Sequence, residues 1–394
     1  MKKLTKNNIF INYARHEITS DDIDAVVSVL KSDYLTQGPE VPNFEQDICN
    51  KVGSKYAVGV NSATSALHIA CIAIELGPGD ILWTSSNTFV ASANCAQYCG
   101  AKVDFIDINP HTWNISTSQL EEKLKEASEK NTLPKAIVAV HFAGQPTDQD
   151  RIWELSKKYG FKIIEDASHA LGASRNGEPV GSCKWSDLTI FSFHPVKAIT
   201  SGEGGMALTN NESLFNKMMM LRTHGITSIR KNFVISSPSP WHYEQQLLGF
   251  NYRMNDIEAT LGRSQLKRLD EFIEKRNYLA HRYNNLLRDL PIKLPMIRNE
   301  NYSAFHIYVV LLELEQISKT HQDVFEGLRK RGIGVNVHYA PVHLHPYYRE
   351  LGFTEGQYTE AESFATSAIT IPLYSQLTEE QQNYVIESLT EELL

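Results

Sequence analysis

A single lysine stands in a setting that could hold it in place for chemistry. Lys197 follows an apolar, strand-like run over residues 188–193 and precedes a Gly-Glu-Gly-Gly turn that leads into a second run over 206–209. An amine fixed at such a position can bond to a carbonyl carbon and transfer protons. Taken alone, however, Lys197 is typical of a surface lysine in a hairpin.

Several other stretches place polar or aromatic side chains directly after predicted strands. Residues 61–64, Asn-Ser-Ala-Thr, open an apolar helix. Free N–H groups at such a helix start can bind a phosphate, and simple capping by Ser or Thr explains the pattern equally well. The remaining candidates are an aromatic ring, a carboxylate, an imidazole and a hydroxyl, at Phe89, Asp166, His169 and Ser192. A core ring, a helix cap and a buried histidine would explain them separately, but only as a coincidence of independent features.

One cofactor, pyridoxal 5'-phosphate (PLP), needs all of these groups together. Its aldehyde requires a lysine as Schiff-base partner, and its pyridine nitrogen requires an anionic carboxylate. Its phosphate needs backbone amides and hydroxyls, and its ring needs an aromatic or apolar face. The sequence therefore predicts a PLP enzyme. A generic nucleotide-binding domain is disfavoured, because neither GxGxxG nor GxxxxGK(S/T) follows a predicted strand.

The elements that would position these side chains alternate between short apolar runs and amphipathic helices. Helices are expected over residues 19–31, about 89–99 and near 150–159, and strands over 56–60, 81–84, 102–108, 136–142, 162–164 and 189–193. This order predicts an α/β fold with a mostly parallel sheet covered on both faces. Ligands of such sheets lie beyond the carboxyl ends of the strands. In the first helix, one apolar face consists of Ile23, Val26, Val27 and Leu30.

Three regions are expected along the chain. Residues 1–254 form a large PLP-binding α/β domain that includes the N-terminal helix and a polar loop. Residues 255–290 form a helical bridge, in which one long helical pattern runs to about residue 287. Residues 291–394 form a smaller α+β domain with a strand over 306–312 and a helix over 322–331.

Composition and charge exclude several classes of function. The formal net charge of −8 argues against non-specific binding of nucleic acid or of an anionic membrane. The basic N-terminal residues 1–8 precede no apolar run of signal-peptide length, and no window is long enough to span a membrane, so a cytoplasmic protein is expected. The five cysteines are expected to be reduced thiols. Cys95 and Cys99 could face one another on a helix, but nothing nearby completes a metal site, so no metal is predicted.

A series of motifs resembles one enzyme family over residues 13–348. The strings, in order, are NSATSALHIA, SNTFVASAN, EDASHALGA, FSFHPVKAITSGEGG, LRTHGI, LGFNYRMNDIEATLG and NVHYAPVHLHPYYRELG. They are similar to the motifs of the sugar-nucleotide aminotransferases of DegT/StrS type, which are fold-type I PLP enzymes that aminate keto-sugars. The resemblance implies a mostly parallel mixed sheet in a large domain and a smaller C-terminal domain.

The resemblance also implies a role for each matching residue. Lys197 matches the Schiff-base lysine and Asp166 the partner of the pyridinium nitrogen. Phe89 matches the ring-stacking position, and His169 stands where many relatives have a glutamine near the cofactor's O3', to which an imidazole N–H can also donate. The other cofactor contacts are the phosphate ligands and an asparagine sent from the neighbouring subunit, namely Ala63, Thr64, Ser192 and Asn251. The last of these implies a homodimer with shared active sites.

Further matches concern the substrate. The positions at which relatives touch the nucleotide sugar are Tyr13, Asp33, Tyr34, Leu35, Thr36, His338 and Tyr339. The strings LTQGP, NSATSAL, SFHPVK and HYAPVHLHPYY most resemble members that aminate C4 of a UDP-linked 2-acetamido-2,6-dideoxy-4-hexulose with L-glutamate, in the pseudaminic acid pathway. Residues 229–245, with Pro238, Pro240, Trp241 and His242, lie where the family varies and could reshape the sugar pocket.

Alternatives within the family stay open at this point. The substrate could instead be that of a UDP-bacillosamine-type or GDP-perosamine-type aminotransferase, and some relatives are regulators without catalysis. Relatives that perform dehydration carry histidine at the position of Lys197, so the lysine favours transamination. The sequence does not fix whether the new amine is axial or equatorial.

Overall fold

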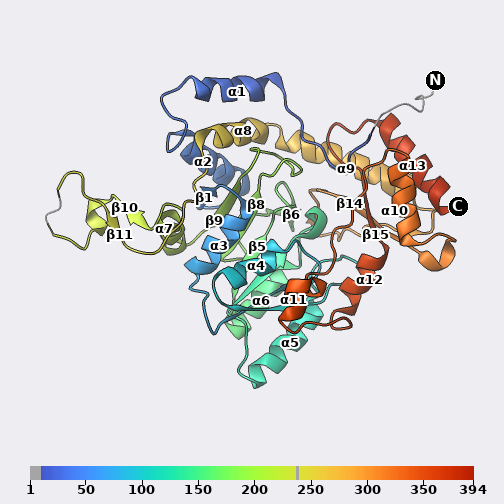
Figure 1. Cartoon of the computed structure of the whole chain (residues 1–394), viewed down its shortest axis with the longest axis horizontal. Helices are drawn as coiled ribbons and strands as arrows, with labels where there is room; N and C mark the ends of the chain where they lie inside the picture. Colours follow the sequence, from blue (N-terminus) through green and yellow to red (C-terminus); the bar gives the residue numbers. More distant parts are fainter. Residues whose placement is uncertain (1–9, 237–238) are drawn as a thin grey trace.

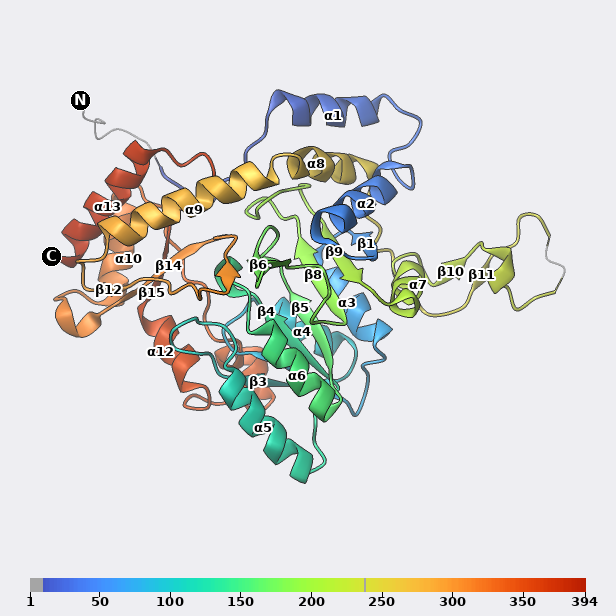
Figure 2. The same ribbon diagram turned by 180° about the vertical axis from the view of Figure 1, so that it is seen from behind.

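The computed structural model describes residues 10–236 and 239–394 of the chain (Figures 1 and 2). The basic N-terminal stretch and Pro238, both mentioned above, lie outside the described residues. Within these ranges no helix combines the length and the apolar character that crossing a lipid bilayer requires.

A seven-stranded sheet forms the centre of the molecule, in the order β1-β9-β8-β5-β4-β2-β3. In chain order the strands are β1 (Tyr56–Val60), β2 (Ile81–Ser85), β3 (Lys102–Ile106), β4 (Ala136–Val140), β5 (Lys162–Asp166), β8 (Leu188–Ser192) and β9 (Gly205–Thr209). All neighbours pair in parallel except β9, which runs antiparallel to both β1 and β8. The predicted α/β fold with a mostly parallel sheet is confirmed.

Helices cover both faces of this sheet, which explains why most residues of its strands are buried on either side. On one face, α3 (Ala63–Ala73) and α4 (Ala91–Tyr98) pack against residues such as Leu82 and Val138. On the other, α5 (Thr117–Glu129) and α6 (Gln149–Tyr159) pack against Trp83 and Ile137. Neighbouring residues of β2 and β4 thus contribute to opposite cores, and each buried aliphatic side chain contributes about 1.5–3 kcal/mol.

The C-terminal part has a sheet and core of its own. The strands β12 (Ile292–Lys293), β14 (Tyr308–Leu312) and β15 (Ala368–Ile371) pair antiparallel in the order β12-β14-β15. The helices α10 (His321–Lys330) and α13 (Glu379–Leu393) pack with α9 (Leu269–Leu286) around this sheet. A short pairing of β13 (Asn301–Tyr302) with β6 (Ser174–Arg175), which also pairs with β7 (Glu178–Pro179), joins this part to the first. The division at residues 254 and 290 stays a prediction.

The helical pattern expected over 255–287 forms two helices rather than one. The first, α8 (Asp256–Leu266), ends before Lys267, and α9 begins at Leu269. Arg268 stands between them and donates through its Nη2 to Asp22 Oδ2 at 2.6 Å, which ties the break to the N-terminal helix. A buried carboxylate fixed by a cation favours this local change of direction.

The N-terminal helix α1 (Ser20–Leu30) lies on α8, at the edge of the molecule (Figures 1 and 2). A capping box with reciprocal bonds between Thr19 and Asp22 begins this helix. Most of its apolar face is exposed, however, and Ile23 and Leu30 each have 55% of their surface accessible. Burial of this face therefore needs something besides the single chain.

The remaining elements surround these layers. They are α2 (Glu40–Val52), α7 (Glu212–Leu221), the two-stranded sheet of β10 (Ile226–Thr227) and β11 (Glu244–Gln245), α11 (Pro346–Glu350) and α12 (Thr359–Ser367). The β10–β11 arm, residues 226–236 and 239–245, projects away from the body of the molecule in both views (Figures 1 and 2). Such an arm buries little of its own surface.

Candidate active site

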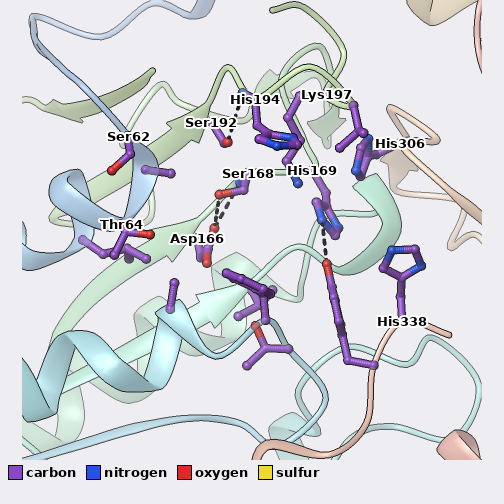
Figure 3. Close-up of a pocket in the computed structure, with 18 of the residues that line it drawn as sticks. Ser62, Thr64, Asp166, Ser168, His169, Ser192, His194, Lys197, His306 and His338 are labelled. Carbon is purple, nitrogen blue, oxygen red and sulfur yellow. Dashed lines mark hydrogen bonds between the residues drawn. The ribbon is translucent and has the colours of Figure 1, made fainter. Parts of the chain in front are cut away.

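A cavity of about 460 Å³ opens beyond the carboxyl ends of the central strands (Figure 3). Val140, Asp166 and Ser192 line it from the ends of β4, β5 and β8. Ten of the residues singled out from the sequence line it, namely Tyr13, Ala63, Thr64, Phe89, Asp166, His169, Ser192, Lys197, His338 and Tyr339. Residues from both ends of the chain therefore meet at one site.

Lys197 lines this cavity from the connection between β8 and β9. Its backbone N–H donates to the carbonyl of His194 at 2.9 Å, and the connection closes where Phe193 N–H donates to Gly204 O at 2.9 Å. Burial lowers the pKa of the Lys197 amine to about 8, although the nearby Asp166 acts in the opposite direction. The interpretation of Lys197 as an ordinary surface lysine is wrong, and about a tenth of this amine is neutral at pH 7.

Asp166 ends β5 with its carboxylate held on both oxygens. Its Oδ2 accepts from Ser92 Oγ of α4 at 2.6 Å. Its Oδ1 accepts from the Ser168 N–H at 3.1 Å and Oγ at 2.6 Å (Figure 3). The residues after Asp166 form turns rather than a helix, so the capping explanation does not apply. A buried carboxylate oriented in this way can face a cationic ring nitrogen.

The start of α3, with Ser62 and Thr64, lies on the side of the cavity away from His306 and His338 (Figure 3). Ser62 caps this helix by accepting from Ser65 N–H at 3.1 Å, so capping is present. The N–H groups of Ala63 and Thr64 belong to the first helical turn, which has no intrahelical acceptors. The first residue of β9, Gly205, presses against this turn, and a Cβ there would lie 2.4 Å from Ala63 N. The helix start, with Ser192 close to it in Figure 3, can therefore approach an anion closely.

A cluster of imidazole and phenol rings forms another wall. Tyr339 Oη lies 3.2 Å from His169 Nε2, whereas His169 Nδ1 is buried without a partner among the described residues. Burial and the nearby Lys197 hold the pKa of His169 well below its usual value, so this ring is neutral. His338 binds Thr370 Oγ1 through Nδ1 at 2.8 Å, and burial lowers its pKa to about 4. Neutral rings of this kind can donate hydrogen bonds without adding charge.

The aromatic side chains place Tyr13 and Phe89 at the same wall. The Tyr13 and His338 ring centroids are 5.4 Å apart, and those of Phe89 and Tyr339 are 6.2 Å apart. Phe89 remains 56% exposed and faces the cavity, which is unusual for a ring in the core. An exposed aromatic plate beside a carboxylate is suited to stacking on a planar ligand.

These groups fit PLP. The cavity combines an amine with a lowered pKa and a hydrogen-bonded carboxylate. It also has the start of α3, against which Gly205 packs too closely for any side chain. The orphaned Nδ1 of His169 is a buried polar atom for which the chain supplies no partner within the described residues. A bound ring with a hydroxyl, a phosphate and an aldehyde would satisfy each of these features.

Five of the predicted residues do not reach this cavity within one chain. Asn251 forms a bridge to Thr223 at the base of the β10–β11 arm. The loop of Asp33, Tyr34, Leu35 and Thr36 lies between α1 and α2, where Leu35 O accepts from Asp256 N–H at 3.0 Å at the start of α8. Their roles remain predictions that require a second subunit.

Three cavity or support residues were missed from the sequence. Ser92 and Ser168 bind Asp166, and His306 lies with its ring centroid 4.2 Å from that of His169. Ser168 could have been found, since a serine two residues after an aspartate commonly binds its carboxylate. Ser92 lies in the first turn of α4 and His306 just before a strand, where no local pattern indicates a site.

Comparisons with known proteins agree with this geometry. The model of the DegT/DnrJ/EryC1/StrS aminotransferase family matches residues 16–390. The UDP-4-amino-4,6-dideoxy-N-acetyl-beta-L-altrosamine transaminase of Campylobacter jejuni is 39% identical over 380 residues, which are 96% of each chain. The structure of PseC from Helicobacter pylori, an aminotransferase involved in the biosynthesis of pseudoaminic acid, matches with a TM-score of 0.89 and 30% identity over 98% of this chain and 99% of that one. The PLP form of the putative sugar aminotransferase Spr1654 from Streptococcus pneumoniae matches with a TM-score of 0.87 and 28% identity over 98% of both chains.

Proposed function

Since this chain belongs to the DegT/DnrJ/EryC1/StrS aminotransferase family, we propose that it aminates C4 of a UDP-linked 2-acetamido-2,6-dideoxy-4-hexulose, with L-glutamate as donor. The general activity, without the identity of the sugar, is that of a PLP-dependent sugar aminotransferase. The specific substrate is proposed because the chain is 39% identical to the Campylobacter jejuni transaminase over nearly its whole length. The likeness to Helicobacter pylori PseC points to the same pathway.

The residues at the two ends of the cavity would hold the cofactor. Lys197 would bind its aldehyde carbon, and the N–H groups of Ala63 and Thr64 with the Ser192 hydroxyl would bind its phosphate. Asp166 would keep the pyridine nitrogen protonated, since Ser92 and Ser168 already orient its carboxylate. Phe89 would stack on the face of the cofactor ring, and His169 would donate a hydrogen bond to its O3'.

Proton transfer is assigned to Lys197. When bound, PLP supplies an electron sink that stabilises negative charge on the carbon that loses a proton. The Lys197 amine would take the proton from Cα of L-glutamate. The amino group of glutamate would stay on the cofactor, and water would supply the oxygen of the released 2-oxoglutarate. In the second half-reaction the same amine delivers a proton to C4 of the sugar. A pKa of about 8 suits this dual role, because both protonation states are accessible near neutral pH.

A homodimer with shared active sites is part of the proposal. The β10–β11 arm exposes Val234 and Trp241 at 87% and 81%, and α1 exposes most of its apolar face. Large apolar side chains gathered on a projecting arm are typical of an interface. A second copy of the chain covering them would bring Asn251 and the loop over residues 33–36 to the neighbouring cavity.

The proposed contacts to the nucleotide sugar come from both chains. Tyr13, His338 and Tyr339 line the cavity within one chain. The residues over 33–36 and the arm with Trp241 and His242 would reach it from the partner. Differences in that arm would then adjust the shape of the sugar pocket between family members.

We also propose a cytoplasmic location. All five cysteines are free thiols, and Cys99 is the one that is not fully buried. Free thiols without disulfides are usual in reducing compartments.

A panel of nucleotide sugars tests the proposed activity. The purified protein is loaded with PLP and incubated with L-glutamate and each of three substrates: the two C5-epimeric UDP-linked 4-keto sugars and GDP-4-keto-6-deoxymannose. We expect amination of one UDP epimer, with kcat/KM at least tenfold above the others, and the product identified by NMR fixes the configuration at C4. Preference for the GDP-sugar, or no amination of any sugar, contradicts the proposal.

A further inference from the structure

We propose that His306, in the wall that it forms with His169 and His338, binds a carboxylate of the amino donor. This inference rests on the proposed function, because it presupposes an amino acid as donor.

The distribution of charge in the cavity leads to this assignment. Among the described residues, its lining contains one lysine and no arginine, and the other basic side chains are imidazoles. Figure 3 shows Ser62 and Thr64 at one side of the cavity and His306 and His338 at the other. The helix start on the first side is taken by the phosphate, and Lys197 is taken by the aldehyde. A fourth imidazole of the lining, His194, lies beside Ser192 in Figure 3, so the wall with His306 is the place on the other side of the cavity where a second anion finds N–H donors.

His306 has no other partner for its ring. The side chain is 3% exposed, and its Nδ1 is buried without a hydrogen bond among the described residues. Burial, together with the nearby His169 and Lys197, holds the pKa of His306 well below its usual value. A buried donor without an acceptor is costly, and native structures usually pair such groups with a ligand or with water. An incoming carboxylate would satisfy this ring and favour its protonated form.

The backbone around His306 is fixed in a way that presents its ring to the cavity. The His306 N–H donates to Ala143 O at 2.9 Å. Gly144, with φ +98°, allows this close approach, since a Cβ there would lie 2.9 Å from His169 O. From the other side, the buried Arg276 donates to His306 O at 3.0 Å through Nη1. Backbone groups on both sides of His306 are thus used to hold one imidazole in place.

Glutarate, which carries the two carboxylates of the donor but no amine, is the probe. Calorimetric titration of the PLP-loaded enzyme compares wild type with His306→Leu and His306→Gln. We expect His306→Leu to weaken glutarate binding about tenfold or more, which is the usual effect of losing a hydrogen bond to a charged group. His306→Gln retains an N–H donor and should lose less. His281→Gln, which changes an exposed histidine of α9, is the matched control and should bind as wild type does.

The half-reactions separate donor binding from a structural role. Stopped-flow absorbance of the cofactor should show that His306→Leu raises the L-glutamate concentration needed for half-maximal rate about tenfold, while KM for the keto-sugar stays within twofold of wild type. Circular dichroism and the cofactor absorbance of each variant report whether it folds and loads PLP.

A measurement on wild type keeps the test sharp if His306→Leu misfolds. With histidine labelled by ¹⁵N, the imidazole signal that is absent in His306→Gln should move towards the protonated position when glutarate is added. An unmoved signal, equal glutarate binding by His306→Leu, or a loss of affinity for the sugar instead of the donor each overturns the inference. Absence of glutarate binding by wild type does so too. Normal glutarate binding without amination of any sugar contradicts the proposed function alone.

Discussion

Ser92 Oγ donates to Asp166 Oδ2 across 2.6 Å and so joins α4 to the end of β5 inside the cavity wall. Both residues are buried, with Ser92 at 0% and Asp166 at 6% exposure. The carboxylate that would face the cofactor nitrogen is therefore oriented by a hydroxyl that does not itself line the cavity. Ser92 is a positioning residue for Asp166.

Replacement of Ser92 tests this relationship. Ser92→Ala removes one hydrogen bond to a charged group, which contributes about 1.5–3 kcal/mol. We expect turnover to fall at least tenfold while the protein still binds PLP with a reduced affinity. The cofactor absorbance during titration with PLP gives that affinity, and Ser213→Ala on the exposed side of α7 is the control. Unchanged turnover in Ser92→Ala would mean that Ser168 alone suffices to orient Asp166.

Replacement of Lys197 tests the attachment of the cofactor. Lys197→Ala removes both the amine that would hold the aldehyde and the group that would move the proton. We expect loss of the absorbance band of lysine-bound PLP and of all turnover, whereas the circular dichroism spectrum stays that of wild type. A wild-type protein that remains colourless with added PLP would contradict the assignment.

The lowered pKa of Lys197 predicts how PLP loading depends on pH. The neutral amine attacks the aldehyde, and with a pKa of about 8 its population rises about tenfold per pH unit below 8 and levels off above it. The rate at which apoprotein takes up PLP should follow the same curve in stopped-flow absorbance. A rate that keeps rising beyond pH 10 would indicate an unperturbed lysine.

The same shift predicts a dependence of stability on pH in the apoprotein. The folded-state pKa of Lys197 lies below its unfolded value, so between about pH 8 and 10.5 the unfolded chain binds more protons. The contribution of Lys197 to the free energy of unfolding should therefore rise through this window and be smallest below pH 8. Urea denaturation of the apoprotein and of Lys197→Met at pH 7.5 and 9.5 isolates it: the advantage of the variant should shrink at the higher pH.

Gly205 should tolerate no side chain. A Cβ there would lie 2.4 Å from Ala63 N, and the atoms it meets are backbone atoms that cannot move aside. We expect Gly205→Ala to lower the free energy of unfolding by about 1–3 kcal/mol and to weaken PLP binding, because the start of α3 is displaced. Gly77→Ala is the matched control, since a Cβ there meets nothing within 4 Å. Equal PLP affinity in the two variants would argue against this cradle as the phosphate site.

Mixed dimers test whether Asn251 acts across the interface. Lys197→Ala and Asn251→Ala are each inactive or weakly active alone. If one subunit supplies Lys197 and the other Asn251, a mixed dimer has one intact site, and random mixing should restore about a quarter of wild-type activity. Refolding or co-expression with two affinity tags gives the mixed species. No restoration would place both residues in the same subunit's site.

The strands of the mostly parallel sheet, and the candidate residues at their ends, could be predicted because both leave local patterns. Each central strand is a short apolar run followed by a polar residue, and Asp166, Ser192 and Lys197 follow such runs. His306 left no such pattern, since its contacts with Ala143 and Arg276 join segments far apart in sequence. The break at Lys267 was missed for the same reason, because it is fixed by a bond from Arg268 to Asp22.

The exposed face of α1 shows another limit of sequence patterns. The periodicity of Ile23, Val27 and Leu30 correctly predicted a helix with one apolar side. Periodicity alone cannot say whether that side is buried within the chain or against another molecule. The structure leaves these side chains accessible, which is why the proposal of a homodimer enters with them.

The antiparallel course of β9 fixes a distance inside the cavity. Ser192 at the end of β8 pairs with Gly205 at the start of β9, so the loop that carries Lys197 begins and ends beside the start of α3. Lys197 and the N–H groups at the start of α3 are therefore held at a fixed separation, which selects ligands of matching length. A vitamin form without the phosphate would contact only Lys197, whereas PLP would contact both groups and be retained.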